Sequence, residues 1–185
     1  MVIMKNKDLV TAGLAAASLL LIPLVAMQFT DQVAWGVGDF LFAGILLAGA
    51  SIAFRLMTRK SGNWVYRAAV GLFVAATLFL IWANLAVGLI GSEDNAANLM
   101  YAGVLAVGLT GAAIARFRAH QMALTLFAMA AGQTLIAIIA IIAGQHRIPG
   151  SSVAEIVNVN GFFAVLFIVS ALLFRHAAEG KAQKA

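Results

Sequence analysis

The chain contains no cysteine, only two prolines and few charged residues. Without thiols it can form neither disulfide bonds nor reactive thiolates. Charged residues make up 10% of the sequence and hydrophobic residues 63%, whereas soluble domains are about a quarter charged and about half apolar. The mean hydropathy is +1.00. This composition excludes an ordinary soluble domain and indicates a membrane protein.

Several motifs of membrane and soluble enzymes are also missing. No lysine lies within a long apolar run, which excludes a retinal Schiff base, and there is no Gly-rich phosphate loop. The three histidines, His120, His146 and His176, do not share a span, so they favour neither a haem site nor a Ser-His-Asp arrangement. His146 lies on the acidic side of the membrane but has no metal-ligand spacing. We expect no enzymatic activity, no cofactor and no metal ion.

Long uncharged runs make up most of the chain. A helix needs about 20 apolar residues to cross roughly 30 Å of hydrocarbon. Five uncharged runs are long enough, and a sixth, 40–54, reaches this length only if its helix begins near Val33, which places Asp39 inside or at the edge of the bilayer. We predict an all-α polytopic membrane protein, a six-transmembrane-helix bundle in a single integral membrane domain over 1–185. Its spans lie near 9–29, 35–57, 67–90, 98–115, 121–143 and 156–175.

Positive charges are sorted to one side of these spans. Arg147 lies alone on the other side, so the positive-inside rule predicts that both termini are cytoplasmic. The first apolar run could also serve as a signal peptide, but it is long for one, and we do not expect cleavage. The net charge of +5 thus reflects topology, and we expect no nucleic-acid partner. The basic residues on the predicted cytoplasmic side are Lys5, Lys7, Arg55, Arg59, Lys60, Arg67, Arg116, Arg118, Arg175, Lys181 and Lys184.

One basic cluster follows the second span. It lies beside Trp64 and Tyr66, and a cluster of this kind suits anionic lipid headgroups. The positive-inside rule alone also explains why basic residues gather there. Trp64 fits the aromatic belt at a membrane interface. The candidate headgroup contacts are Arg55, Arg59, Lys60 and Arg67.

Spans two and four share a sequence pattern. "DFLFAGILLAGASIAFR" aligns with "NLMYAGVLAVGLTGAAIARFR", with Asp39 over Asn98 and Gly44 over Gly103. A possible tandem helical-hairpin repeat explains the match. Convergence explains it equally well, because all membrane helices use the same few residue types.

Small residues recur at helical steps in several spans. In lipid, such residues allow helices to approach closely. Gly44 with Ala48 and Ala102 with Ala106 are two such pairs. A third set, expected on one face of the third span, consists of Thr77, Asn84, Gly88 and Gly91.

The segment "IWANLAVGLIGSEDNAANLMYAG", Ile81 to Gly103, gathers amides and acids between two apolar runs. Gly91 is a candidate C-cap of the third helix, and Asp94 or Asn95 is a candidate N-cap of the fourth. Capping thus explains part of the cluster without a ligand. The surface that contains this hinge should attract cations, because it carries most of the acids: Asp31, Asp39, Glu93, Asp94 and Glu155.

Capping does not account for Asn84, Asp39 or Gln133. Asn84 is expected about 12 Å below the outer end of its helix, and Gln133 near the middle of span five. Amides in hydrocarbon need partners, and an ionised Asp39 should pair, lose its charge or snorkel. Interhelical hydrogen bonding is one interpretation. The other is a binding site open to the outside, formed by Asp39, Asn84, Glu93, Asp94, Asn98, Tyr101 and Gln133.

The segment "GSEDNAANLMYAGVLAVG", Gly91 to Gly108, followed by "ARFR", resembles small multi-pass proteins of bacterial inner membranes that have no assigned activity. The resemblance implies a bacterial inner membrane and supplies no substrate, cofactor or catalytic residue. We predict a binding or assembly module that is embedded in the lipid bilayer. Its acidic hinge is expected to contact another membrane protein or a second copy of the chain. The alternative is a small cation or proton channel or transporter that uses Asp39, Asn84 and Gln133.

Overall fold

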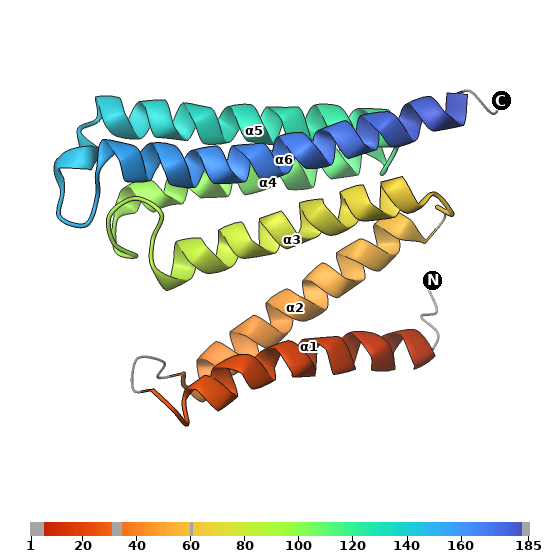
Figure 1. Cartoon of the computed structure of the whole chain (residues 1–185), viewed down its shortest axis with the longest axis horizontal. Coiled ribbons are helices and arrows are strands. Elements are labelled where there is room, and N and C mark those ends of the chain that lie inside the picture. Colours follow the sequence, from red (N-terminus) through yellow and green to blue (C-terminus); the bar gives the residue numbers. More distant parts are fainter. Residues whose placement is uncertain (1–5, 31–34, 60, 183–185) are drawn as a thin grey trace. The chain divides into compact units, whose positions relative to one another are not determined.

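The computed structural model describes residues 6–30, 35–59 and 61–182, and all regular structure within them is helical. The predicted all-α class is confirmed. The chain divides into two compact units, Met1–Leu56 and Met57–Ala185. In chain order, the elements of Figure 1 are α1 (Asn6–Ala26), α2 (Val37–Thr58), α3 (Trp64–Ala86), the 3₁₀ turn η1 (Ala96–Leu99), α4 (Met100–Ala115), α5 (Ala119–Ile142), the 3₁₀ turn η2 (Gln145–Arg147) and α6 (Val153–Ala182).

In the described part of the chain, five helices are long and apolar enough to cross a membrane: α2, α3, α4 with η1, α5 and α6. In α1, the segment Ala17–Ala26 is apolar but shorter than these five helices. The chain is therefore an integral membrane protein. The ends of α2 and α5 agree with the predicted spans to within two residues. By contrast, α3 ends at Ala86 rather than near residue 90, and α6 continues to Ala182 instead of ending near residue 175.

The first unit is a helical hairpin of α1 and most of α2. Gly44 of α2 lies close to α1, because a Cβ atom added there would be 3.9 Å from Cδ1 of Leu20. At the start of α2, the ring of Trp35 meets the ring of Phe40 edge to face. The Gly44 contact is of the kind predicted for small residues between membrane helices.

In the second unit, α5 packs along both α4 and α6, and α3 packs along α6 (Figure 1). Its core contains the fully buried side chains of Leu80, Met122, Leu126 and Phe167. A seam of small residues on α4 faces α5. A Cβ atom added at Gly108 would lie 2.9 Å from Sδ of Met129, and one added at Gly111 would clash with Thr125.

The predicted seam of Ala102 and Ala106 is wrong for this unit, because both residues are exposed. Gly108 and Gly111 lie on the side of α4 that faces α5. At Gly111 a larger side chain would collide with Thr125, whereas at Gly108 it would meet the flexible end of Met129, which can move aside.

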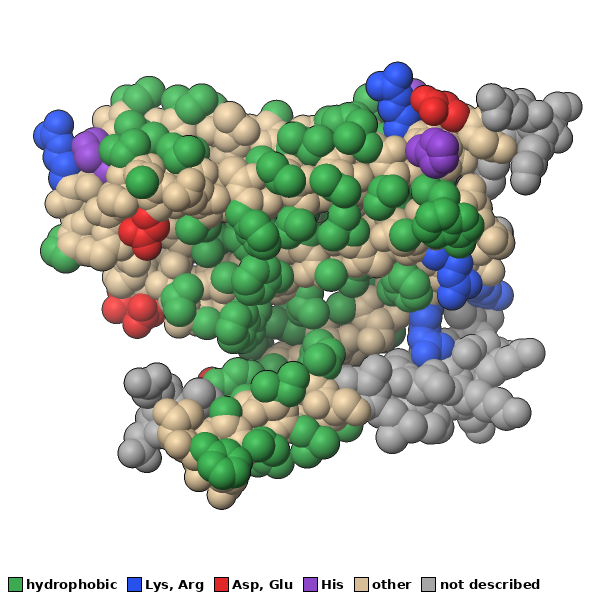
Figure 2. All heavy atoms as spheres, in the orientation of Figure 1, with side chains coloured by type: hydrophobic (Ala, Val, Ile, Leu, Met, Phe, Trp, Pro, Cys, Tyr) green, Lys and Arg blue, Asp and Glu red, His purple; other side chains and the backbone are tan. Residues whose placement is uncertain are grey.

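Charged side chains of the second unit gather at its two ends, with apolar side chains between them (Figure 2). We call these the cap end and the basic end. The cap end contains the α3–α4 and α5–α6 loops, with Glu93, Asp94, Arg147 and Glu155. An apolar band between two charged ends is the pattern expected of helices that span a bilayer. The basic end carries Arg59, Arg67, Arg116, Arg118 and Arg175.

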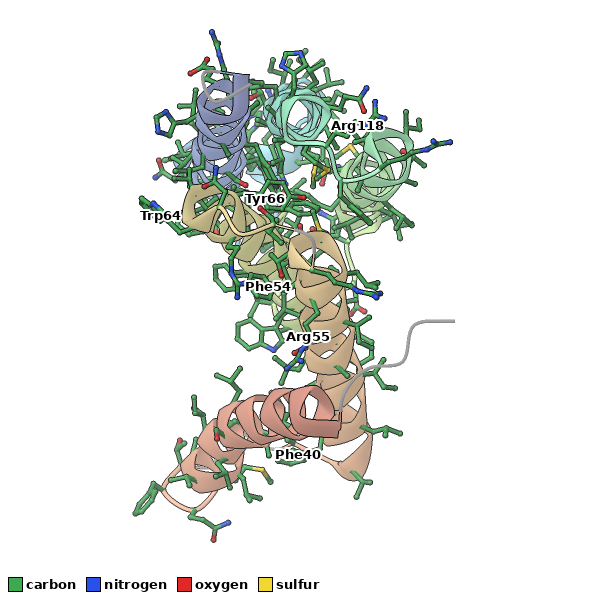
Figure 3. The ribbon with its side chains drawn as sticks, turned by 90° about the vertical axis from the view of Figure 1, so that its right-hand side faces the viewer. Phe40, Phe54, Arg55, Trp64, Tyr66 and Arg118 are labelled. Carbon is green, nitrogen blue, oxygen red and sulfur yellow. The ribbon has the colours of Figure 1, made fainter. Side chains whose placement is uncertain are left out.

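At the basic end, Tyr66 ties the start of α3 to the α4–α5 turn. Its buried hydroxyl donates a 2.7 Å hydrogen bond to the carbonyl of Phe117, and its ring meets Phe174 edge to face. The turn needs this support because Arg116 and Phe117 both adopt positive φ angles, 46° and 60°, which are unfavourable for residues with side chains. Figure 3 shows Tyr66 at the start of α3, beside Trp64, which points away from the helices and is 75% exposed.

We expect the Tyr66→Phe variant to lower the free energy of unfolding by about 1 kcal/mol, because it removes one hydrogen bond to a strained turn. Thermal unfolding in detergent micelles, followed by circular dichroism, measures the change. Trp64→Phe is the matched control, since this aromatic side chain is exposed, and it should leave the transition unchanged. Equal effects of the two substitutions would contradict the role given to the Tyr66 hydroxyl.

Candidate functional site

The third helix ends at Ala86, before the glycine that was predicted to cap it. Its C-cap is Val87, and the chain then turns at Gly88, whose φ is +69°. A side chain at Gly88 would clash with the backbone of Ser92 and Glu93, so the loop folds back tightly on itself. The prediction that Gly91 caps the helix is wrong, and Gly88 and Gly91 do not lie on a helix face.

Gly91 instead joins the two loops of the cap end. It also has a positive φ, +72°, and a Cβ atom added there would lie 2.7 Å from Cδ1 of Ile148 in the α5–α6 loop. Both loops, residues 87–95 and 143–152, together with the η1 turn, are called the cap below. The two glycines are needed for different reasons, Gly88 for the fold of its own loop and Gly91 for contact with the neighbouring loop.

The buried side chain of Asn98 holds the α3–α4 loop in place. Its Oδ1 accepts hydrogen bonds from the backbone amides of Leu89 and Ile90, both at 3.0 Å. Its Nδ2 donates to the carbonyl of Ser92 at 2.7 Å and to that of Ile90 at 3.4 Å. Leu89 and Ile90 are themselves buried. One amide side chain therefore satisfies backbone groups of the loop that have no partner in a helix.

Asn95 performs a similar task and connects the two loops. Its Oδ1 accepts from the amide of Ala97 at 3.0 Å, so it is the N-cap of η1, and of the two predicted N-caps it is the one that is confirmed. Its Nδ2 donates to the carbonyl of Ile90 and to Oε1 of Gln145, both at 2.9 Å. In the second loop, Ser152 caps α6, since its hydroxyl accepts from the amide of Glu155. The cap is thus a hydrogen-bonded structure rather than two independent loops.

The acidic residues of the hinge lie outside this network. Glu93 and Asp94 follow Ser92 at the turn of the loop, and both are exposed. The loop backbone on either side of them is held by Asn98 at Ser92 and by the bond from the Asn95 amide to the Ser92 carbonyl. The cap therefore presents two adjacent carboxylates on a fixed piece of backbone.

Asn84 lies in the last turn of α3, and the predicted depth of about 12 Å is wrong because the helix ends at Ala86. Its Nδ2 is 3.5 Å from the backbone carbonyl of Asn98, which brings two predicted site residues together. Its Oδ1 is buried and has no hydrogen-bond partner among the residues that the structure describes. Asn84 thus lies in α3 next to the cap and contacts it through the carbonyl of Asn98.

Asp39 belongs to the first unit, where capping explains it after all. The α2 helix begins at Val37, so Asp39 is in its first turn, and Oδ2 accepts a 2.8 Å hydrogen bond from the amide of Gly36. This arrangement, in which an acid reaches back to the residue before the helix, is half of a capping box. Asp39 is exposed rather than deep in the helix. A shared site of Asp39 with residues of the second unit stays a prediction.

Tyr101 is fully buried, and its hydroxyl donates a 3.2 Å hydrogen bond to Oδ1 of Asn160. Asn160 in turn donates from Nδ2 to the carbonyl of Ile156 one turn earlier in α6. The sequence interpretation did not include Asn160 in the site, although an amide within an apolar run was a usable signal. Gln133, by contrast, is fully buried in α5, and its amide has no hydrogen-bond partner among the residues that the structure describes.

The candidate lipid-headgroup residues do not all fall in one unit. Arg59 and Arg67 are exposed at the basic end of the second unit. Arg55 is half-buried in the last turn of α2, within the first unit. Lys60 lies outside the described residues.

Over the described ranges, no group of three or more His, Cys, Asp or Glu side chains could hold a metal ion. No protein-family model, no curated protein and no solved structure matches the chain. The cap, with its fixed loops and two exposed carboxylates, is therefore the candidate functional site.

We expect the Asn98→Ala variant to lower the free energy of unfolding by about 2–4 kcal/mol, because it leaves two buried backbone amides without acceptors. Thermal unfolding in detergent measures this effect. Asn158→Ala removes an exposed asparagine of α6 and serves as the matched control, with no expected change. If both variants unfold at the wild-type temperature, Asn98 does not hold the loop.

Proposed function

We propose that this integral membrane protein is a binding or assembly module of the bacterial inner membrane, and that the cap is its contact point. One observation carries the proposal: the Asn98 side chain fixes the backbone of the loop from which Glu93 and Asp94 project into solvent. A loop that is already ordered loses little conformational entropy when a partner binds. The partner that suits this loop is a protein surface rich in Lys or Arg.

The charge distribution supports an orientation for the module. Arginines gather at the basic end and most acids at the cap end (Figure 2). By the positive-inside rule, the basic end is cytoplasmic, so both termini are cytoplasmic and the cap faces the periplasm. The resemblance of Gly91–Gly108 to small bacterial inner-membrane proteins supports the same location.

We propose no catalytic role for the cap. Its two principal amides, Asn95 and Asn98, are occupied by backbone groups of the loop and by Gln145. At the basic end, the exposed Arg59 and Arg67 suit contact with anionic lipid headgroups.

The second candidate function is a cation or proton channel or transporter. The observation that favours it is the buried amide of Gln133, which has no partner in the described part of the chain, because polar groups within membrane helices often mark a solute path. Asn84, which also has an unpaired oxygen, lies in the last turn of α3 beneath the cap. The intervening layer contains Tyr101, whose hydroxyl is already paired with Asn160. The contact module is therefore the better supported of the two.

We expect a photo-crosslinking amino acid at Asp94 to capture a protein partner in intact cells. The capture should fall at least several-fold with a Glu93→Lys change, because reversing a charge at the contact repels a basic partner. Glu93→Gln should give an intermediate yield, and higher salt in isolated membranes should weaken the capture. Quantitative immunoblotting of the crosslinked species measures all three.

The same crosslinker at Leu109 is the control, because this side chain is 76% exposed on α4, away from the cap. A crosslinked dimer at the Asp94 position would identify a second copy of the chain as the partner. A yield that is unaffected by both charge and salt would contradict the acidic contact.

Proteoliposomes distinguish the second candidate. The purified protein is placed in the vesicle membrane, and a pH-sensitive dye is enclosed in the lumen. We expect neither a proton flux nor a cation-driven pH change above that of vesicles without protein. A flux that the Gln133→Leu variant abolishes, while Thr134→Val leaves it intact, would instead support transport. Thr134 is the suitable control because it is the next residue of α5, is exposed and bonds to its own helix at Ala130.

A further inference from the structure

The side chain of Gln133 differs from the other buried polar side chains in the second unit. Asn98, Thr125, Asn160 and Ser170 each have a hydrogen-bond partner within the protein. Gln133 is 0% exposed, and neither Oε1 nor Nε2 has a partner in the described chain. A buried amide that stays unpaired costs several kcal/mol in an apolar medium. A group outside the described residues, such as a water molecule, would satisfy it.

The contacts between α4 and α5 give the depth of Gln133. Gly111 faces Thr125, Gly108 faces Met129, and a Cβ atom added at Gly132 would lie 3.2 Å from Val104. Gln133 therefore lies at the level of Val104. This level is about one helical turn, or roughly 5 Å, nearer the basic end than Tyr101.

The contacts of α6 place Thr77 at the same level. The Tyr101–Asn160 bond aligns α4 with α6, so Val104 is level with Phe163, three residues further along α6. Phe163 contacts Phe79 of α3 at a ring-centroid distance of 5.5 Å. Thr77 is two residues from Phe79, a rise of about 3 Å. Its hydroxyl is also buried and also has no partner among the described side chains and backbone.

The layers on either side of this level differ in polarity. Toward the cap, the next layer contains the Tyr101 hydroxyl and the Asn160 amide. Toward the basic end, the next layer is formed by Phe73, Met129 and Phe167, all buried and apolar. The Ser170–Ala69 hydrogen bond confirms the alignment of α3 with α6 on the far side of that layer. The unpaired groups thus lie between a polar layer and an apolar one.

We infer that the amide of Gln133 binds internal water at this level, and that Thr77 is the second polar group of the site. A buried water typically makes about three hydrogen bonds to polar groups that lack other partners. Gln133 offers two donors and an acceptor, and a threonine hydroxyl offers one donor and an acceptor. The apolar layer of Phe73, Met129 and Phe167 lies on the side of this level that faces the basic end, and the Tyr101–Asn160 pair lies on the side that faces the cap.

Water fits this site better than a metal ion does. The groups at this level are a neutral amide and a hydroxyl, whereas protein sites for Ca²⁺ and Mg²⁺ typically include carboxylate ligands. The inference is independent of the role of the cap, because it depends only on the interior of the second unit.

The test is nuclear magnetic resonance on the full chain in lipid nanodiscs, with water as the probe. The protein is deuterated, and only glutamine side-chain amides are protonated and ¹⁵N-labelled. We expect the Gln133 amide to show a dipolar cross-peak to water of the sign given by a bound molecule rather than by chemical exchange. The Gln133→Met variant, similar in length and apolar, identifies the signal by its loss.

Thr77→Val tests the second partner. It should weaken the cross-peak at least twofold, and Thr125→Val should leave it unchanged, because the Thr125 hydroxyl is buried but bonds to Gln121 of its own helix. Equal effects of the two valine variants would remove Thr77 from the site. A Gln133 amide without a water cross-peak in the wild-type protein would overturn the inference, and this result does not depend on whether any variant folds.

Discussion

Backbone amides of a buried loop must find acceptors, and after α3 one side chain supplies them. When α3 ends at Ala86, the chain enters a loop in which Leu89 and Ile90 are buried. In apolar surroundings an unpaired amide is costly, and the carboxamide of Asn98 satisfies both. The same side chain donates to the loop carbonyls, so the loop closes on itself. The form of the cap, and the place of its acids, follow from this single residue.

The asparagines and the acids of the hinge therefore have separate tasks. Asn95 and Asn98 point inward and satisfy the backbone, while Glu93 and Asp94 are exposed to solvent. An amide is suited to the first task because it donates and accepts at once and carries no charge to bury. A carboxylate is suited to the second because it is stable only where water or a cation meets it.

Polar contacts also align the helices of the second unit. Tyr66 with Phe117, Ser170 with Ala69, and Tyr101 with Asn160 each join two elements at a defined depth. Such contacts matter in a membrane, where lipid tails are as apolar as the helices and offer no hydrophobic reward for packing. Gln133, whose amide has no partner among the described residues, fits this series only if water completes its hydrogen bonds.

The number of helices, their approximate ends and the sorting of charge to two ends could be predicted from the sequence. They depend on local composition and on the thickness of a bilayer, and both can be counted along the chain. Asn95 could be predicted as a cap for the same reason, since a cap acts on its own neighbours.

Other features depended on the tertiary structure. Gly88 and Gly91 are equally able to adopt a positive φ, and only the fold of the loop decided that α3 stops before the first of them. Likewise Gly108 and Gly111, not Ala102 and Ala106, face α5, because the side of a helix that is buried depends on where its neighbours lie. Tertiary packing also decided that Asn98 has hydrogen-bond partners and that Gln133 has none among the described residues. A hydrogen bond between residues far apart in the chain exists only when the packing of whole helices brings its two atoms within reach.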